Sequence, residues 1–349
     1  MVEATPAARP GKSLGTRLRE LLGRRQVWPL VTLALIVGLN VFLSPGFFNI
    51  RIVEGRLFGS TIDILYRATP IAIVALGMAI VIGTKGVDLS VGAIVAICGA
   101  VISWRIHEGD PHIVVLLLAL FAGLLCGVWN GFLVAILDIQ PIIATLVLMV
   151  SGRGIGLMIN LIYGGTNPSF ESPLLQGLSV GSIGLIPARL ILAAATFIVL
   201  WFLIRKTAIG LFTEAVGGNA AAASLTGINA RLVKYAAYLI CGLLAGWAGV
   251  IITADTHTSD PVSQGLYLEL DAILAVVIGG GSLAGGRIFL GMTIIGTLVI
   301  QSLTTLILTS GLPPEYNLVV KAVVVLIVLL LQSDNGRNAV LGLFARRQA

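Results

Sequence analysis

Apolar residues gather in long runs along the chain, separated by short segments that contain glycine, proline and charged residues. One of these runs, 270–281, is short for a full crossing and ends in three consecutive glycines, which favours a half-helix or a broken span. The pattern predicts an all-α, polytopic integral membrane protein with about ten transmembrane helices, one of them short or broken. The other nine runs approach the roughly 20 residues that a helix needs to cross a bilayer; they are 28–44, 68–84, 91–106, 112–137, 141–161, 188–204, 233–254, 288–309 and 317–332.

Composition and charge agree with this fold class. The chain is 57% hydrophobic and 11% charged, whereas soluble domains carry about 25% charged residues. The net charge of +6 needs no nucleic-acid partner, because cytoplasmic loops of membrane proteins are rich in Lys and Arg. We expect a cytoplasmic N-terminal tail at 1–27, a transmembrane domain at 28–332 and a cytoplasmic C-terminal tail at 333–349. With that topology most basic residues are cytoplasmic, namely Arg9, Lys12, Arg17, Arg19, Arg24, Arg25, Lys85, Arg205, Lys206, Arg231, Lys234, Arg287, Arg337, Arg346 and Arg347.

The sequence lacks the motifs of a self-sufficient enzyme or ATPase. A phosphate-binding loop needs two glycines spaced before Lys and Ser/Thr, and Pro6 stands where the first would precede Gly11, Lys12 and Ser13. The three histidines and three cysteines show no metal-ligand spacing, and no nucleophile elbow is present. We therefore expect no catalytic residue, no metal and no cofactor in this chain.

One internal segment, 205–232, is neither apolar enough to insert nor charged enough to be an ordinary solvated linker. Its stretch 214–229 contains good helix formers, and Gly227 ends the helical pattern. A solvated connector is one interpretation. A solvated helix would normally carry Lys–Glu pairs, however, and the small side chains here leave a surface that another protein can approach closely.

Three segments resemble ABC importer permeases of the ribose and branched-chain amino acid class. The stretch EAVGGNAAAASLTGI resembles the helix with which those permeases dock on their ATPase. GVDLSVG at 86–92 and LELDAILAVVIGGGSLAGGR at 268–287 are similar to two signatures of the sugar-type members. Three further segments, 56–70, 129–154 and 310–325, look closest to the galactofuranose permease subfamily.

The resemblance implies a sugar permease of the bacterial inner membrane that works by alternating access. The sugar would be galactofuranose or a similar one such as ribose, xylose or galactose. Its partners would be a cytoplasmic ATPase that binds ATP, a second permease (a homologous chain or a second copy), a periplasmic sugar-binding protein and the lipid bilayer. An ion-coupled secondary transporter is the alternative, and it would need ionisable groups deep in the spans. The resemblance assigns ATPase coupling to Glu214, Ala215, Gly217, Asn219, Ala222, Ala223 and Gly227.

Four polar residues are candidates for the sugar path: Asp88, Ser90, Asn130 and Asp271. Each also has a structural interpretation. Asp88 and Ser90 can cap the helix that starts at 91, Asn130 can bond a neighbouring helix, and Asp271 suits a helix N-terminus through the helix dipole.

Two cations and a set of glycines complete the candidates. Arg153 lies within a span, where we expect an internal partner such as a helix-end carbonyl, with contact to the substrate as the alternative. Lys321 is expected to extend its amine towards the membrane surface. The glycines, predicted to allow close packing or sharp bends, are Gly86, Gly92, Gly279, Gly280, Gly281, Gly285 and Gly286.

Overall fold

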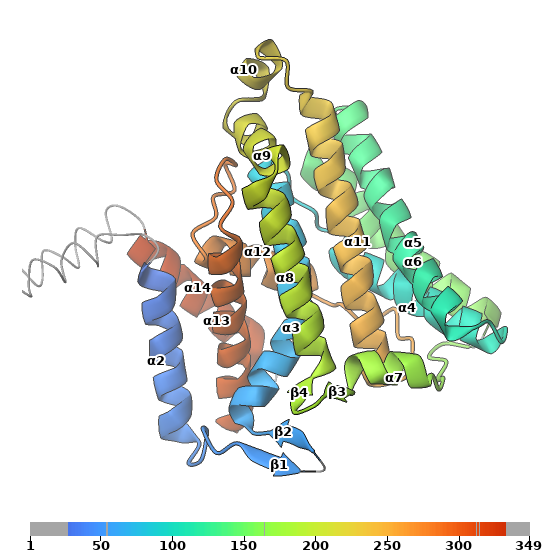
Figure 1. The fold of residues 1–349 in the computed structure, drawn as a ribbon, viewed down its shortest axis with the longest axis vertical. Coiled ribbons are helices and arrows are strands. Elements are labelled where there is room, and N and C mark those ends of the chain that lie inside the picture. Colours follow the sequence, from blue (N-terminus) through green and yellow to red (C-terminus); the bar gives the residue numbers. More distant parts are fainter. Residues whose placement is uncertain (1–26, 54, 164, 312, 314, 333–349) are drawn as a thin grey trace, which may run out of the picture.

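The computed structural model describes residues 27–332 except 54, 164, 312 and 314 (Figure 1), so both predicted tails lie outside the described residues apart from Val27. The elements are α2 (Val27–Leu43), β1 (Arg51–Val53), β2 (Arg56–Phe58), α3 (Ser60–Gly83), α4 (Val91–His107), α5 (His112–Gly131), the π-helical turn η1 (Phe132–Ile136), α6 (Pro141–Tyr163), α7 (Pro173–Ser179), β3 (Ser182–Ile183), β4 (Ile186–Pro187), α8 (Ala188–Lys206), α9 (Ala208–Gly218), α10 (Ala220–Leu225), α11 (Ala230–Thr256), α12 (Leu268–Ile278), α13 (Leu290–Thr309) and α14 (Tyr316–Gln332).

The predicted fold class is confirmed. Within the described residues, each of the ten apolar runs corresponds to one helix. Six of these helices are long and apolar enough to span a bilayer, namely α3, α5 with η1, α6, α8, α11 and α13. The others are α2, α4 and α14, with 17 residues each, and α12, with 11.

Helix α3 begins at Ser60, eight residues before the apolar run that predicted it. Its first two turns contain Asp63 and Arg67, whose charges hide the helix from a hydropathy pattern. The two side chains lie four residues apart and form an exposed ion pair with a distance of 2.9 Å between Arg67 Nε and Asp63 Oδ2. Pairs at this spacing support a helix.

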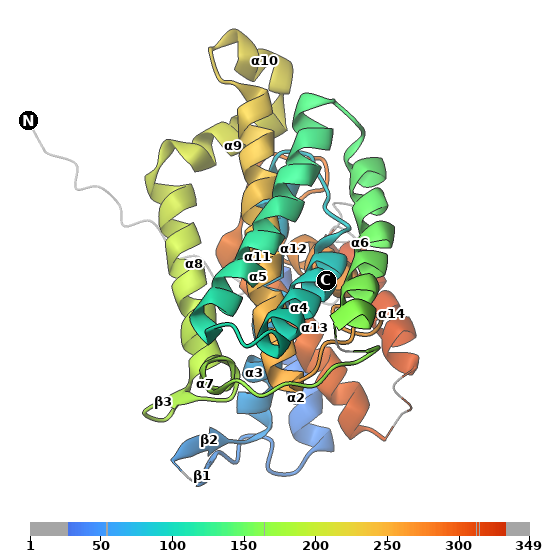
Figure 2. The ribbon, with the colours of Figure 1, turned by 90° about the vertical axis from the view of Figure 1, so that its right-hand side faces the viewer.

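The bundle has two distinct ends (Figure 2). Helices α9 and α10 project beyond α8 and α11 at one of them, here called the α10 end. The antiparallel pairs β1–β2 and β3–β4 lie with α7 at the other, the hairpin end. Two predicted cytoplasmic cations lie at the α10 end: Lys85 Nζ donates to the Gly218 carbonyl (3.1 Å) and Arg205 to the Ile288 carbonyl (2.9 Å).

Small residues let the central helix α11 pack closely on α5. A Cβ added at Gly127 of α5 would lie 2.7 Å from the carbonyl oxygen of Tyr238, and one at Gly242 of α11 would lie 2.6 Å from the Gly127 nitrogen. Such contacts let two helix backbones pack closely. Close packing stabilises helix association in a membrane, where the hydrophobic effect does not favour helix–helix over helix–lipid contact.

We predict that Gly127→Ala lowers the stability of the protein by about 1–3 kcal/mol, because the added methyl group overpacks the α5–α11 contact. Gly291→Ala is the matched control, since an added Cβ there meets nothing within 4 Å. Alanine is a better helix former than glycine, so the control should leave stability unchanged or raise it. Thermal unfolding of both variants in detergent tests the prediction, and equal effects would contradict it.

Candidate functional site

Helix α4 begins deep inside the bundle. Ala93, near its start, lies against Gly152, the middle residue of α6, where an added Cβ would be 3.1 Å from the Ala93 Cβ. Near the other end of α4, the ring of Trp104 stacks on Tyr163, the last residue of α6, with ring centroids 4.5 Å apart. Helix α4 therefore covers only the half of α6 nearer the hairpin end, and the connector 84–90 enters the bundle from the α10 end to reach it.

A second irregular segment, 258–267, enters from the hairpin end and is here called the mid-membrane loop. Asn160 Nδ2, in the last turn of α6, donates to the Ser259 carbonyl at 3.0 Å. Deeper in the bundle, Arg153 Nη1 donates to the carbonyls of Pro261 (2.9 Å) and Gln264 (3.2 Å). Helix α12 then runs from this depth towards the α10 end for only 11 residues, which confirms the predicted half-helix.

The first turns of α4 and α12 meet halfway through the bundle. An added Cβ at Gly92 would lie 2.3 Å from the Gly265 carbonyl and 2.6 Å from Glu269 Oε2. Each helix N-terminus carries a partial positive charge, and Arg153 is nearby, so the Glu269 carboxylate is a local counter-charge. Many secondary transporters place their substrate sites where discontinuous helices meet near the bilayer midplane.

Arg153 has the internal partner that its sequence position predicted. Besides the two carbonyls above, its Nη1 also reaches the carbonyl of Val262 at 3.2 Å. A single cation thus satisfies three backbone acceptors of the mid-membrane loop. An ionisable residue at this depth is tolerated only with such partners or with water.

The structure brings together Asp88, Ser90 and Asn130, three of the four predicted path residues, and buries each of them completely. Asp88 Oδ1 accepts from the Ser90 backbone N–H (3.0 Å), the Ser90 hydroxyl (2.6 Å) and Asn130 Nδ2 (3.2 Å). Asn130 Nδ2 also donates to Ser90 Oγ at 2.7 Å. The predicted interhelical hydrogen bond of Asn130 is confirmed. A role in the sugar path stays a prediction, because no part of the cluster reaches a surface in this conformation.

The predicted helix cap at Asp88 and Ser90 is wrong in its detail. Ser90 occupies the N-cap position of α4, but its side chain makes no capping hydrogen bond. Asp88 binds the N–H of Ser90, two residues ahead, rather than an N–H inside the helix. The side chain stabilises the connector, not the first turn of α4.

Asp271, the fourth predicted path residue, forms an ion pair with Lys321. Both carboxylate oxygens of Asp271 accept from Lys321 Nζ at 2.9 Å, joining α12 to α14. The expectation that Lys321 extends its amine to the membrane surface is therefore wrong, since the residue is only 7% exposed. The half-buried carboxylate of Asp271, 50 residues away along the chain, neutralises it instead.

The predicted coupling residues divide between two helices and two environments. Glu214, Ala215 and Gly217 belong to α9, whereas Ala222 and Ala223 belong to α10. Asn219 lies between the helices and caps α10, accepting the Ala222 N–H at 3.0 Å; Gly227 (φ 86°) follows α10.

The interpretation of Gly217 as part of an open docking surface is wrong. An added Cβ at Gly217 would lie 1.7 Å from the Gly83 carbonyl and 2.7 Å from the Gly286 nitrogen. Glu214 also faces inwards, where its Oε1 accepts the Ile288 N–H at 3.1 Å. Helix α9 therefore packs on the end of α3 and on the loop 279–289 (Figure 1), which buries Gly217 and leaves Glu214 partly exposed, so a coupling role of Glu214 stays a prediction.

The open surface at this end belongs to α10 and the residues after it. Ala222 and Gly227 are exposed, as predicted, but Ala223 is buried. Leu225, which the sequence analysis did not select, is 91% exposed at the end of α10. A leucine among small polar residues gives no periodic signal, so only its position in the fold makes it a candidate.

The predicted structural glycines lie at tight contacts or at turns. Gly285 has φ 81°, and an added Cβ would lie 2.3 Å from the Lys85 side chain, so only glycine fits there. An added Cβ would also clash within 3 Å at Gly86, Gly92, Gly279 and Gly281, whereas Gly280 and Gly286 adopt positive φ in open surroundings.

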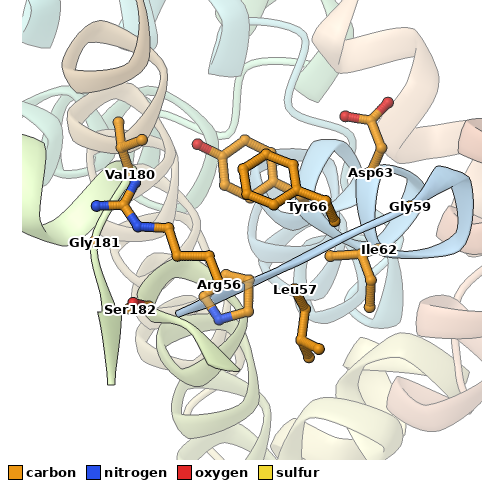
Figure 3. A pocket seen from close by; sticks show the side chains of 11 residues that line it. Arg56, Leu57, Gly59, Ile62, Asp63, Tyr66, Val180, Gly181 and Ser182 are labelled. Atoms are coloured by element: carbon orange, nitrogen blue, oxygen red, sulfur yellow. The ribbon is translucent and has the colours of Figure 1, made fainter. Parts of the chain in front are cut away.

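A cavity of about 240 Å³ opens at the hairpin end between the start of α3 and the strands β2, β3 and β4 (Figure 3). Its lining includes Arg56, Asp63 and Tyr66. Behind it, the guanidinium of Arg189 lies 3.3 Å from the centre of the Tyr66 ring, and it pairs with Asp255 at 2.6 Å. This network fixes α3, α8 and α11 against one another.

The family of permease components of the branched-chain amino acid transport system matches this chain over residues 60–329. The chain belongs to this family. YtfT of Escherichia coli K12, a galactofuranose transporter permease protein, is 49% identical to it over 93% of this chain and 95% of that protein. The fructose import permease protein FruF of Bifidobacterium longum is 35% identical over 92% of this chain and 91% of that protein. The ribose import permease protein RbsC of E. coli K12 is 35% identical over 87% of this chain and 92% of that protein. No solved structure matches the chain.

We predict that Lys321→Met or Asp271→Leu alone lowers stability by about 3–5 kcal/mol, because each leaves an uncompensated buried charge. The double variant removes both charges and should recover most of that loss. A double-mutant cycle on thermal unfolding measures the coupling. Additive losses would show that the pair contributes little.

We also predict that Asp88→Asn reduces transport while leaving stability nearly normal, because the amide keeps an acceptor for Ser90 but lacks the charge. Asp88→Leu should lower both, since buried donors without partners cost about 1–3 kcal/mol each. Transport and melting temperature are compared for the two variants. If the Asp88→Asn variant transports at the wild-type rate, Asp88 has only a structural role.

Proposed function

We propose that this chain is the permease subunit of an ATP-binding-cassette importer that moves a monosaccharide inward by alternating access. The observation that carries the proposal is the 49% identity to YtfT across nearly the whole of both chains. Galactofuranose is accordingly the first candidate sugar, ahead of the fructose and ribose that name more distant relatives.

The coupling surface for a separate ATPase is α10, on the cytoplasmic side. Its projecting position and the exposed Leu225 suit insertion into a groove on a partner. The chain itself holds no cofactor, and ATP binds to the partner. Because Gly217 of α9 packs on Gly83 and Gly286, movement of α10 and α9 would be passed to α3 and to the loop that follows α12.

The remaining partners follow from the same assignment. The α10 end and both tails are cytoplasmic, which agrees with Lys85 and Arg205 at that end. The hairpin end, with its cavity beside Tyr66, faces the periplasm of a bacterial inner membrane and receives a sugar-binding protein. A second permease, either a homologous chain or another copy, completes the path.

The alternative of an ion-coupled secondary transporter has little support. Among the described residues, Asp271 is neutralised by Lys321, whereas Asp88 and Glu269 are buried acids that such a transporter could use, so the comparisons decide between the two functions. The family match and the named relatives are permease components of import systems, which do not point to an ion gradient as the energy source.

We predict that Leu225→Glu abolishes ATPase binding and sugar uptake without loss of the folded permease, because a carboxylate replaces an apolar anchor. Leu185→Glu at the hairpin end is the matched control: it is 46% exposed and should leave ATPase binding unchanged. Co-purification of the ATPase and ATP-driven uptake of galactofuranose, fructose and ribose into proteoliposomes containing the binding protein provide the measurements. Uptake of none of these sugars by the wild-type complex would overturn the proposed function.

A further inference from the structure

The exposed side of the mid-membrane loop carries polar side chains next to two apolar ones, Val262 (58% exposed) and Leu266 (49% exposed). Ser263 is exposed, Tyr267 is 43% exposed, and Asp260 is partly exposed. Asp260 Oδ1 accepts the Val262 N–H at 3.0 Å, and its Oδ2 accepts from the Ser263 hydroxyl. None of these residues was selected from the sequence, where the segment between α11 and α12 gives no sign of its depth.

The depth of the loop follows from its contacts with α6. Helix α6 has 23 residues, which at 1.5 Å per residue span about 34 Å, the thickness of a bilayer core. Arg153 is one residue past its midpoint, and Arg153 holds the carbonyls of Pro261, Val262 and Gln264. The loop therefore lies near the middle of the membrane.

Irregular backbone and exposed polar groups at that depth cannot face lipid. They are tolerated only against protein or beside a water-filled cavity. The side of the loop turned towards α4 and α6 is covered, since Pro261 and Gln264 are buried. The exposed side of the loop, which carries Ser263 and Tyr267, must therefore face either water or a surface of the second permease.

Glu269 marks the same place from inside the protein. It is 3% exposed, and its Oε2 has no hydrogen-bond partner among the described residues. The carboxylate lies beside Gly92, where the two half-depth helices meet. An acceptor without a partner at mid-depth is costly unless it binds water or a hydroxyl group during the transport cycle.

We propose that the exposed face of the mid-membrane loop is the contact surface for the sugar at the centre of the path. The Tyr267 ring packs on the C–H face of the sugar, and Asp260 and Ser263 bond its hydroxyl groups. Glu269 is the second acceptor, reached when α4 and α12 separate. This inference rests on the proposed function, because it assumes a neutral polyhydroxy substrate.

Tyr267 allows a sharp test, because its backbone is in the left-handed region at φ 63°. Glycine prefers this conformation, so Tyr267→Gly removes the ring without disturbing the fold. We expect about a ten-fold loss of uptake efficiency, the size of one aromatic contact, with an unchanged or higher melting temperature. Tyr267→Phe keeps the ring and should retain uptake.

His257, which has φ 55° at the hairpin end of α11, provides the matched control. His257→Gly relieves the same kind of backbone strain outside the loop and should leave uptake unchanged. All variants are measured as complete complexes with ATPase and binding protein. If the Tyr267→Gly variant takes up sugar as fast as the unchanged protein, the inference is overturned and the proposed function stands. If the complex with the unchanged protein takes up no sugar, the proposed function is overturned.

A second measurement tests whether water reaches the exposed face of the mid-membrane loop. Ser263→Cys is made in a chain with Cys126 replaced by alanine, because Cys98 and Cys241 are buried. A membrane-impermeant thiol reagent should label Cys at 263 in the assembled complex, and saturating galactofuranose should slow the labelling. Failure to label, or labelling that the sugar does not affect, would place the face away from the path.

Discussion

A backbone that leaves helical geometry inside a membrane must find partners for its carbonyl and amide groups, because lipid supplies none. The guanidinium of Arg153 meets this requirement for three carbonyls of the mid-membrane loop. With those acceptors satisfied, α12 can begin halfway through the bundle, opposite the start of α4. The meeting of two half-depth helices, and the polar surface beside it, depend on that side chain together with Asn160, which bonds the Ser259 carbonyl.

The helical runs could be predicted from hydropathy because each is one continuous apolar segment, and even the short α12 was recognised from its length and terminal glycines. Depth could not be predicted in this way. The residues after α11 contain Asp, Pro, Ser and Gly, as an external loop does, and only the contacts of Asn160 and Arg153 place them within the bundle.

The partners of side chains were predictable only where chemistry left few choices. A cation such as Arg153 between two glycines needs a backbone acceptor, and it has three. Lys321 lies six residues into α14, as an amine reaching the surface would, and nothing local reveals Asp271 on another helix. The small residues of 214–229 have a similar ambiguity: the same absence of bulk that leaves Ala222 open allows Gly217 to touch Gly83.

Close contacts between backbones explain how the two ends of the bundle can act together in the proposed mechanism. Gly286 donates its N–H to the Gly83 carbonyl at 3.1 Å, and Gly217 packs on both residues. Backbone atoms meet directly at this junction, and the side chains of Ile288 and Lys85 pack beside it, so we expect α9, the end of α3 and the loop after α12 to move together. Since α3 leads into the connector of α4, and the loop follows α12, a push on α10 acts on both half-depth helices whose N-termini meet at Gly92 and Gly265.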